Sequence, residues 1–331
     1  MQTVEPIDWL LEEDEENPGV RFFALRDLGE QSPVDPEVVA ARRAVMATGP
    51  VPAILEAQHP EGYWVKPGTG YSPKYRSTVW QILFLAELGA DPENAGVRRG
   101  CEYLLSHAIA RNGAFSASSP ARPSSAVPCL NGNLLFALRQ LGWGDDPRVG
   151  IATEWLARAV TGEREMTYLK SGTAGPCFAC SANGGQPCAW GANKVMRALL
   201  AVPPQERTRA ISAAIETGVG FLLSRDPAEA DYPYTTRVSS TWFKLGFPLT
   251  YWSDVLETVS VLAAAGCGED PRLENALAFV LGKRDAQGRW KLENGLKGKM
   301  WHDIERKGKP SKWITLRALR ALKDLGVEGA G

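Results

Sequence analysis

The chain has 331 residues, of which 44% are hydrophobic and 23% charged, so it can bury a substantial core. Its formal net charge of −1 leaves no overall electrostatic footprint for nucleic acid or an anionic membrane. No stretch reaches the roughly 18 apolar residues of a membrane span, and the acidic residues 1–17 do not resemble a signal peptide, so we expect a cytoplasmic protein without a transmembrane segment.

The first fifty residues are predicted to form helices that stand outside the main repeat. The segment from Asn17 to Leu28 combines a Pro-Gly start with apolar residues at helical spacing. We expect residues 1–50 to form a helical extension that closes or caps a domain made by residues 51–331.

Five apolar segments of similar length recur along the rest of the chain. They align without gaps, have helical spacing and few charges, and mostly end in Gly, which ends helices in a left-handed turn. The final glycines are 53, 124 and 60 residues apart, and the long interval is two periods. The five windows are 78–89, 131–142, 191–201, 255–266 and 315–326.

A second, more charged helix is predicted after each window. Asp-Pro pairs at Asp146-Pro147 and Asp270-Pro271 are typical of helix starts, and amphipathic stretches follow them. No segment shows the alternating pattern of a strand. Apolar helices that alternate with amphipathic ones predict an inner and an outer ring of helices.

Short turns with Gly and an aromatic residue separate the helix pairs. Gln58-His-Pro-Glu-Gly-Tyr-Trp64 matches the Q-x-x-x-G-x-W turn of squalene and oxidosqualene cyclases, and Gln287-Gly-Arg-Trp290 is a degenerate copy. From about residue 50 to 326 the chain resembles the α/α toroid of terpenoid cyclases and protein prenyltransferase β-subunits. More closely, it is similar to bacterial prenyltransferase/squalene-oxidase-repeat proteins of unassigned activity. The resemblance implies an all-α toroid of five to six repeats around an aromatic-lined cavity.

The catalytic motifs of these families are missing from the sequence. Class II cyclases use an Asp-x-Asp-Asp acid, whereas the nearest segment here reads Ser253-Asp254-Val-Leu-Glu257. The Asp-Asp-x-x-Asp magnesium box of class I synthases and the Asp-x-Cys zinc motif of prenyltransferases are also missing. Ligand types suited to zinc nevertheless occur at predicted inner-helix starts, namely Cys129, Cys188, Asp254 and His302.

Four of the six cysteines lie in loops at these helix starts. The motif Pro-Cys-x-x-Gly occurs at 128–132 and again 59 residues later at 187–191, beside a Cys-x-x-Cys arm. Equivalent positions of neighbouring repeats lie side by side, so we expect these thiols to face one point, where they suit Zn²⁺. The alternative is a set of free thiols, one pair of them reactive. The predicted zinc ligands are Cys129, Cys177, Cys180 and Cys188, with His302, Asp254 or water as alternatives in fourth place.

Other side chains near the helix starts are candidates for substrate binding. Lys74 and Arg76 suit an anionic head group above an apolar cavity, whereas the Lys-rich segment 297–312 is interpreted as a solvated loop. The predicted substrate-binding residues are Lys74, Arg76, Trp190, Trp252 and Trp313.

The candidate catalytic residues are Asp254, Tyr75 and His302. Alignment of the windows on their final Gly places Asp254 and Tyr75 near one level at the mouth of the cavity, where acid–base groups are expected. A buried, salt-bridged Asp254 that joins two helices is the competing interpretation.

Three functional hypotheses remain open. The first is a zinc-dependent transferase or lyase that acts on an apolar, isoprenoid-like small molecule in the central cavity, with zinc as a Lewis acid. The second is a metal-free dehydratase or isomerase that uses Cys, Asp254 and Tyr75. The third is a binding protein in which zinc only joins two repeats.

Overall fold

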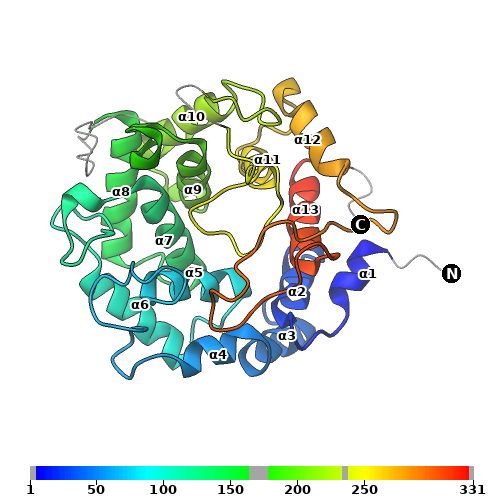
Figure 1. The fold of residues 1–331 in the computed structure, drawn as a ribbon, viewed down its shortest axis with the longest axis horizontal. Helices are drawn as coiled ribbons and strands as arrows, with labels where there is room; N and C mark the ends of the chain where they lie inside the picture. The colour runs from blue at the N-terminus through cyan, green and yellow to red at the C-terminus, as the bar shows by residue number, and fades with distance from the viewer. Residues whose placement is uncertain (1–4, 164–177, 233–237, 328–331) are drawn as a thin grey trace.

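The helices of the protein form a closed ring (Figure 1). The computed structural model describes residues 5–163, 178–232 and 238–327. Within these ranges the chain forms thirteen α-helices and one hairpin of two-residue strands, β1 (Ala179–Cys180) and β2 (Gln186–Pro187). The predicted all-α toroid is therefore confirmed, and the hairpin is its one small departure from the expectation of no strand.

Six helices surround the centre of the ring. Five of them contain the predicted windows, and successive members pack against each other. The sixth, α2, lies between α13 and α5. Its residue Gly19 is in close contact with both, since a Cβ atom at this position would meet the Leu88 carbonyl of α5 and the Trp313 ring of α13. The inner helices are α2 (Pro18–Phe23), α5 (Thr78–Leu88), α7 (Pro128–Gln140), α9 (Ala189–Leu200), α11 (Val255–Ala264) and α13 (Lys312–Asp324).

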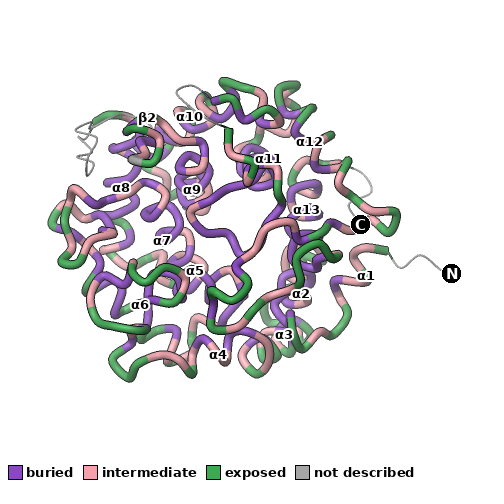
Figure 2. The backbone as a smooth tube through the Cα atoms, viewed as in Figure 1, coloured by how far each residue is buried: buried purple, intermediate pink, exposed green. Residues whose placement is uncertain are grey.

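A second layer of helices covers the inner ring. Figure 2 shows buried residues concentrated in the inner helices and exposed residues on the periphery. The side chain of Asp146 accepts a hydrogen bond from the Arg148 amide and caps α8, as the Asp-Pro signal predicts. The peripheral helices are α1 (Pro6–Leu11), α3 (Pro36–Ala47), α4 (Pro50–Glu56), α6 (Ala95–His107), α8 (Pro147–Thr161), α10 (Arg209–Leu222) and α12 (Glu274–Leu281).

Short irregular helices connect these elements. A π-helical turn, Ala24–Leu28, continues α2. The remaining short elements are 3₁₀ turns at Pro123–Ser125, Ser181–Asn183, Pro204–Glu206 and Pro271–Leu273. The last of these begins directly after Asp270, so the helix signal at Asp270-Pro271 starts a 3₁₀ turn that leads into α12.

The repeated Gly-aromatic turn has a structural role that the two copies share. The Trp64 indole donates a 2.7 Å hydrogen bond to the Ile54 carbonyl in α4, and its backbone N–H donates to the Thr78 hydroxyl in α5. Trp290 repeats both contacts, with the Val280 carbonyl in α12 and the Thr315 hydroxyl in α13. Each turn therefore ties the end of a peripheral helix to the start of the next inner helix.

Glycine in the first Pro-Cys-x-x-Gly motif allows a close approach between two inner helices. A Cβ atom on Gly132 would lie 2.5 Å from the Lys194 carbonyl carbon and 2.7 Å from the Val195 nitrogen. At Gly191 a Cβ atom would make only ordinary contacts, at 3.6 Å from Phe178. The first copy therefore sets the spacing of α7 and α9, which places Lys194 beside the centre of the ring.

Three long loops lie at the end of the ring where the inner helices start. They are residues 65–77, 241–254 and 291–311, and the last two cross the middle of the ring in Figure 1 in yellow and orange. Among the described residues no single helix is long and apolar enough to cross a membrane. The pair α3 and α4 meets that test by length and composition only when combined, and it is bent by 49° at the junction.

Candidate functional site

A cavity of about 450 Å³ lies at the centre of the ring, lined by the C-terminal ends of α2, α5, α7 and α9 and by residues along most of α11 and α13. Ligand pockets of several hundred Å³ with mostly apolar walls and a few polar groups are typical of small-molecule sites. The apolar part of its lining includes Phe23, Phe136, Phe247, Leu249, Trp313 and Leu316.

The loop 241–254 supplies one wall of this cavity. The Phe247 ring stacks on the Trp313 ring with 4.3 Å between centroids. Further along the same loop, Tyr251 packs against Trp80 and Trp190, whose centroids lie 6.3 and 6.4 Å away. The aromatic lining expected from the resemblance is thus formed partly by a loop, and the inner helices supply the rest.

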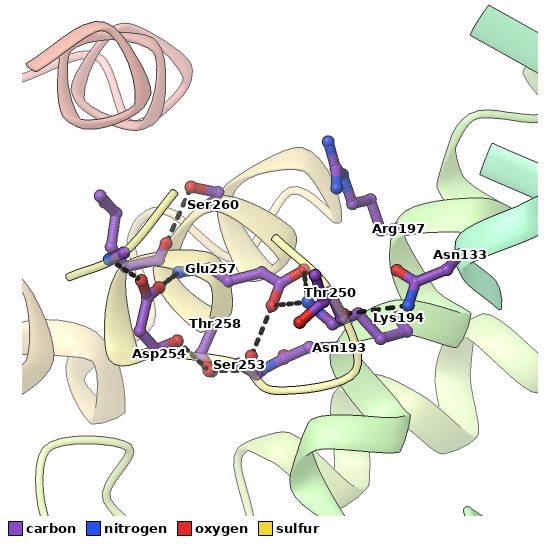
Figure 3. A network of polar contacts seen from close by, with 12 residues as sticks. Asn133, Asn193, Lys194, Arg197, Thr250, Ser253, Asp254, Glu257, Thr258 and Ser260 are labelled. Atoms are coloured by element: carbon purple, nitrogen blue, oxygen red, sulfur yellow. Dashed lines mark hydrogen bonds and ion pairs between the residues drawn. The ribbon is translucent and has the colours of Figure 1, made fainter. Parts of the chain in front are cut away.

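A buried ion pair joins two inner helices beside the cavity. The Nζ atom of Lys194 in α9 lies 2.7 and 2.5 Å from the two carboxylate oxygens of Glu257 in α11 (Figure 3). Lys194 is 0% exposed and Glu257 is 2% exposed, and Glu257 also lines the cavity. Burial lowers the pKa of Lys194, and the charge of Glu257 opposes that effect.

A chain of hydrogen bonds fixes the orientation of Glu257. The Ser253 hydroxyl donates to Glu257 Oε2 at 2.6 Å, and the amide of Asn193 donates to Ser253 Oγ at 2.7 Å. The same amide donates to the Thr258 hydroxyl at 2.8 Å. The carboxylate is therefore held by a rigid polar network at the wall of an apolar cavity.

Asp254 occupies a different, fully paired position. Its carboxylate accepts hydrogen bonds from the backbone N–H groups of Gly246 and Glu257, and Arg317 of α13 donates to both of its oxygens at 2.9 and 3.0 Å. Asp254 is 0% exposed and does not line the cavity. This is the geometry of the competing interpretation, in which Asp254 joins two helices.

Further charged groups lie around the cavity. Arg197 of α9 pairs with Glu87 of α5 at 2.5 Å, and its guanidinium lies 3.8 Å from the Phe136 ring centroid. Asp27 pairs with Arg320 of α13 and with its neighbour Arg26. The apolar interior is thus bordered by ion pairs that connect different inner helices.

Three of the predicted zinc ligands, Cys129, Cys180 and Cys188, lie in one region at the other end of α7 and α9, but they are not grouped closely enough to hold an ion. Cys188 precedes α9, and Cys180 lies in strand β1. A hydrogen bond from the Cys188 thiol lowers the pKa of Cys180 to about 6, supported by the backbone N–H groups of Ala182 and Asn183. Burial raises the pKa of Cys129 to about 12, and the nearby charge of Cys180 adds to that shift.

No complete metal site is present in the part of the chain that the structure describes. Within that part, no three His, Cys, Asp or Glu side chains are grouped closely enough to hold an ion. Cys177, the fourth predicted ligand, lies outside the described residues. His302 lies in loop 291–311, and its Nδ1 atom is buried with no hydrogen-bond partner among the described groups.

The predicted substrate-binding residues lie in two places. Trp313 lines the cavity, whereas Trp190 packs on Tyr251 and Trp252 packs against Gly246. Lys74 and Arg76 are exposed in loop 65–77 and stack on aromatic rings instead of lining the cavity.

Tyr75 also lies outside the cavity lining. Its hydroxyl group hydrogen-bonds the Tyr251 hydroxyl at 3.3 Å. Burial raises the pKa of Tyr75, and this hydrogen bond adds to that effect, so the phenol keeps its proton.

Sequence reasoning missed the charged residues that the cavity and its network contain. Lys194, Glu257 and Arg317 all fall inside predicted inner-ring windows, where the other side chains are mostly apolar. A charge within a buried helix requires a partner, so these positions carried a signal that could have identified them.

Comparison with known proteins gives similarity in structure only. No protein-family profile and no curated protein matches the sequence. A protein from Actinoplanes is 15% identical, with 94% of this chain and 90% of that chain covered and a TM-score of 0.45. A variant of the type II terpene cyclase MstE from Scytonema, solved with its substrate geranylgeranyl dihydroxybenzoate, is 15% identical over 82% of this chain and 74% of that one, with a TM-score of 0.40. MstE without ligand is 13% identical over 82% and 94%, with a TM-score of 0.30.

Proposed function

We propose that the protein binds an apolar, isoprenoid-like small molecule in the central cavity and acts on it by proton transfer, as an isomerase or lyase. The observation that carries this proposal is the position of Glu257, a buried carboxylate held at the wall of an otherwise largely apolar cavity. A few polar groups held in place beside mostly apolar walls are typical of small-molecule sites.

Glu257 has an unoccupied lone pair, which a general base requires. Its Oε1 accepts one hydrogen bond, from Lys194, and its Oε2 accepts two, from Lys194 and Ser253. A carboxylate offers about four lone-pair sites, so among the described residues one site on Oε1 has no donor. In the proposed step a substrate C–H bond breaks, the proton passes to Oε1, and the electron pair forms a new C=C bond. In an isomerase the neighbouring double bond shifts and takes the proton back from Oε1 at its far carbon, whereas in a lyase a leaving group departs with its bonding pair.

The walls suit an apolar substrate. Phe136, Phe247 and Trp313 contribute aromatic rings to the lining, and these rings pack well against hydrocarbon. Asp254, the residue first suggested for acid–base chemistry, has four donors on its carboxylate, so the proposal assigns the chemistry to Glu257 instead.

Filling the cavity is expected to weaken ligand binding by at least about tenfold, since a lost apolar pocket contact costs a few kcal/mol. Ser260 lines the cavity, and Ser260→Phe places a ring there. The measurement is quenching of tryptophan fluorescence during titration with farnesol. Ala44→Phe on the exposed face of α3 is the matched control and should bind like the native protein. Equal affinity in all three proteins would contradict a ligand site in this cavity.

We also propose that Cys180 and Cys188 bind Zn²⁺ at the start of α9, together with Cys177, which lies outside the described residues. The proposal is supported by the proximity of the Cys180 and Cys188 sulfurs and by the thiolate character of Cys180, because thiolates are the preferred sulfur ligands of zinc. When bound, the ion would supply a structural link. The proton-transfer step uses Glu257 and does not pass through zinc.

Elemental analysis of the purified protein tests this second proposal. We expect about one zinc ion per chain in the native protein and less than about half of that in Cys188→Ser, because one thiolate ligand is lost. Cys267→Ser is the control, since Cys267 follows α11 and is not one of the predicted ligands, and it should keep the native zinc content. A native protein free of zinc after expression in zinc-supplemented medium would exclude the site.

A further inference from the structure

Two loops at the start of the inner helices carry a strong local positive charge. Residues 65–77 and 291–311, here called the mouth patch, contain nine Lys and Arg residues and three carboxylates, which gives a formal charge of +6 in a chain whose total is −1. All nine cations are exposed. They are Lys66, Lys74, Arg76, Lys291, Lys297, Lys299, Arg306, Lys307 and Lys309.

The cations of the mouth patch are not neutralised within the molecule. None of the nine forms an ion pair with a described residue. The carboxylates of the patch have other partners, since Glu293 pairs with Lys283 and Asp303 accepts from the Gly298 amide. The net charge of the whole chain therefore conceals a surface that attracts anions.

The two loops form one surface. The Arg76 guanidinium donates to the Lys299 carbonyl at 3.3 Å, and the Trp301 indole donates to the Arg76 carbonyl at 3.2 Å. Three cations lie over aromatic rings, with Lys74 at 4.4 Å from the Tyr251 centroid, Arg76 at 5.1 Å from that of Trp301, and Lys299 over Tyr75. Stacking in this way keeps the charges exposed while it fixes the loops to each other.

Apolar side chains stand among these cations. Trp301 is 37% exposed and Val65 is 51% exposed. Val65 has a φ of 70°, a left-handed conformation that β-branched residues rarely adopt, and Tyr75 in the same loop has a φ of 67°. Backbone conformations of this kind concentrate at functional surfaces, and here one of them belongs to an exposed apolar residue.

We propose that the mouth patch docks the protein on an anionic lipid bilayer, with the cations at the lipid phosphates and carboxylates and with Trp301 and Val65 among the head groups. Basic residues interleaved with exposed tryptophan and aliphatic groups are suited to a bilayer interface. A nucleic acid would stack bases on open aromatic faces, whereas the Trp301 ring is already stacked against Arg76 and the exposed Val65 offers no stacking surface.

Sedimentation with lipid vesicles tests this proposal. Vesicles of phosphatidylcholine with about one third phosphatidylserine should bind the native chain at low salt, and pure phosphatidylcholine vesicles should not. We expect Lys297→Ala/Lys307→Ala to reduce the partition coefficient about 25-fold, since each lost cation costs about fivefold. Trp301→Ala alone should also reduce the partition coefficient below that of the native chain, although it leaves the charge unchanged.

Matched controls separate docking from loss of structure. Arg43→Ala/Arg209→Ala removes two exposed cations from peripheral helices α3 and α10 and should leave vesicle binding unchanged. The farnesol titration measures ligand binding in the cavity and not vesicle binding, so the patch variants should give the same farnesol affinity as the native protein. If farnesol does not bind at all, the proposed cavity function fails, but the vesicle experiment still tests the docking proposal. Absence of native binding to the anionic vesicles, an equal effect of the control pair, or binding to single-stranded DNA in place of vesicles would overturn the proposal.

Discussion

Lys194→Met is expected to destabilise the protein by about 3–5 kcal/mol, because it leaves a buried carboxylate without its partner. Glu257 is 2% exposed, and within the described part of the chain its one further side-chain donor is the Ser253 hydroxyl. Urea denaturation followed by circular dichroism measures the loss. The midpoint should fall without a change in slope, since the surface exposed on unfolding is the same.

Two comparison variants identify the cause of this loss. Lys194→Met/Glu257→Leu removes both charges and should be less destabilised than the single variant, because hydrophobic replacement of a complete buried pair is often neutral. Arg158→Met breaks the partly exposed pair with Glu154 and should cost less than about 1 kcal/mol. A double variant as unstable as Lys194→Met would show that packing of the lysine chain matters more than its charge.

The helices of the ring were predictable because each buries an apolar stretch with its own start and stop signals. The windows correspond to α5, α7, α9, α11 and α13, with starts up to three residues earlier than expected at α7 and α13. The place of α2 in the ring was harder to predict from the sequence. It has only six residues, and what brings it between α13 and α5 is the absence of a side chain at Gly19, a contact over long sequence distances.

The site was predictable only in part, because its polar residues act in pairs from distant segments. Periodicity placed Lys194 and Glu257 in buried helices, but it does not show that residues 63 positions apart face each other. The duplicated motif placed Cys129 and Cys188 at the starts of neighbouring inner helices, but among the described residues no three of the predicted ligands lie within reach of one ion. The mouth patch depends on loop conformations, such as Val65 at a φ of 70°, that no sequence pattern specifies.

Asp254→Asn is expected to lower the stability by several kcal/mol, which corresponds to a fall in melting temperature of roughly 5–10 °C. The carboxylate is an acceptor for four donors, two from Arg317 and two from the backbone N–H groups of Gly246 and Glu257. An amide nitrogen in place of either oxygen would face donors, and the guanidinium of Arg317, whose pKa is raised by Asp254 in spite of burial, would lose its counter-charge.

A calorimetric melt of Asp254→Asn therefore decides between the two interpretations of this residue. Asp285→Asn, at a partly exposed pair with Arg289 in the turn after α12, is the matched control and should move the melting temperature by no more than about 2–4 °C, in keeping with a weak surface pair. The farnesol titration of the surviving folded fraction should match the native protein, since Asp254 does not line the cavity. An unchanged melting temperature together with lost turnover would instead make Asp254 the catalytic carboxylate, and Glu257 would then have only a structural part in the network.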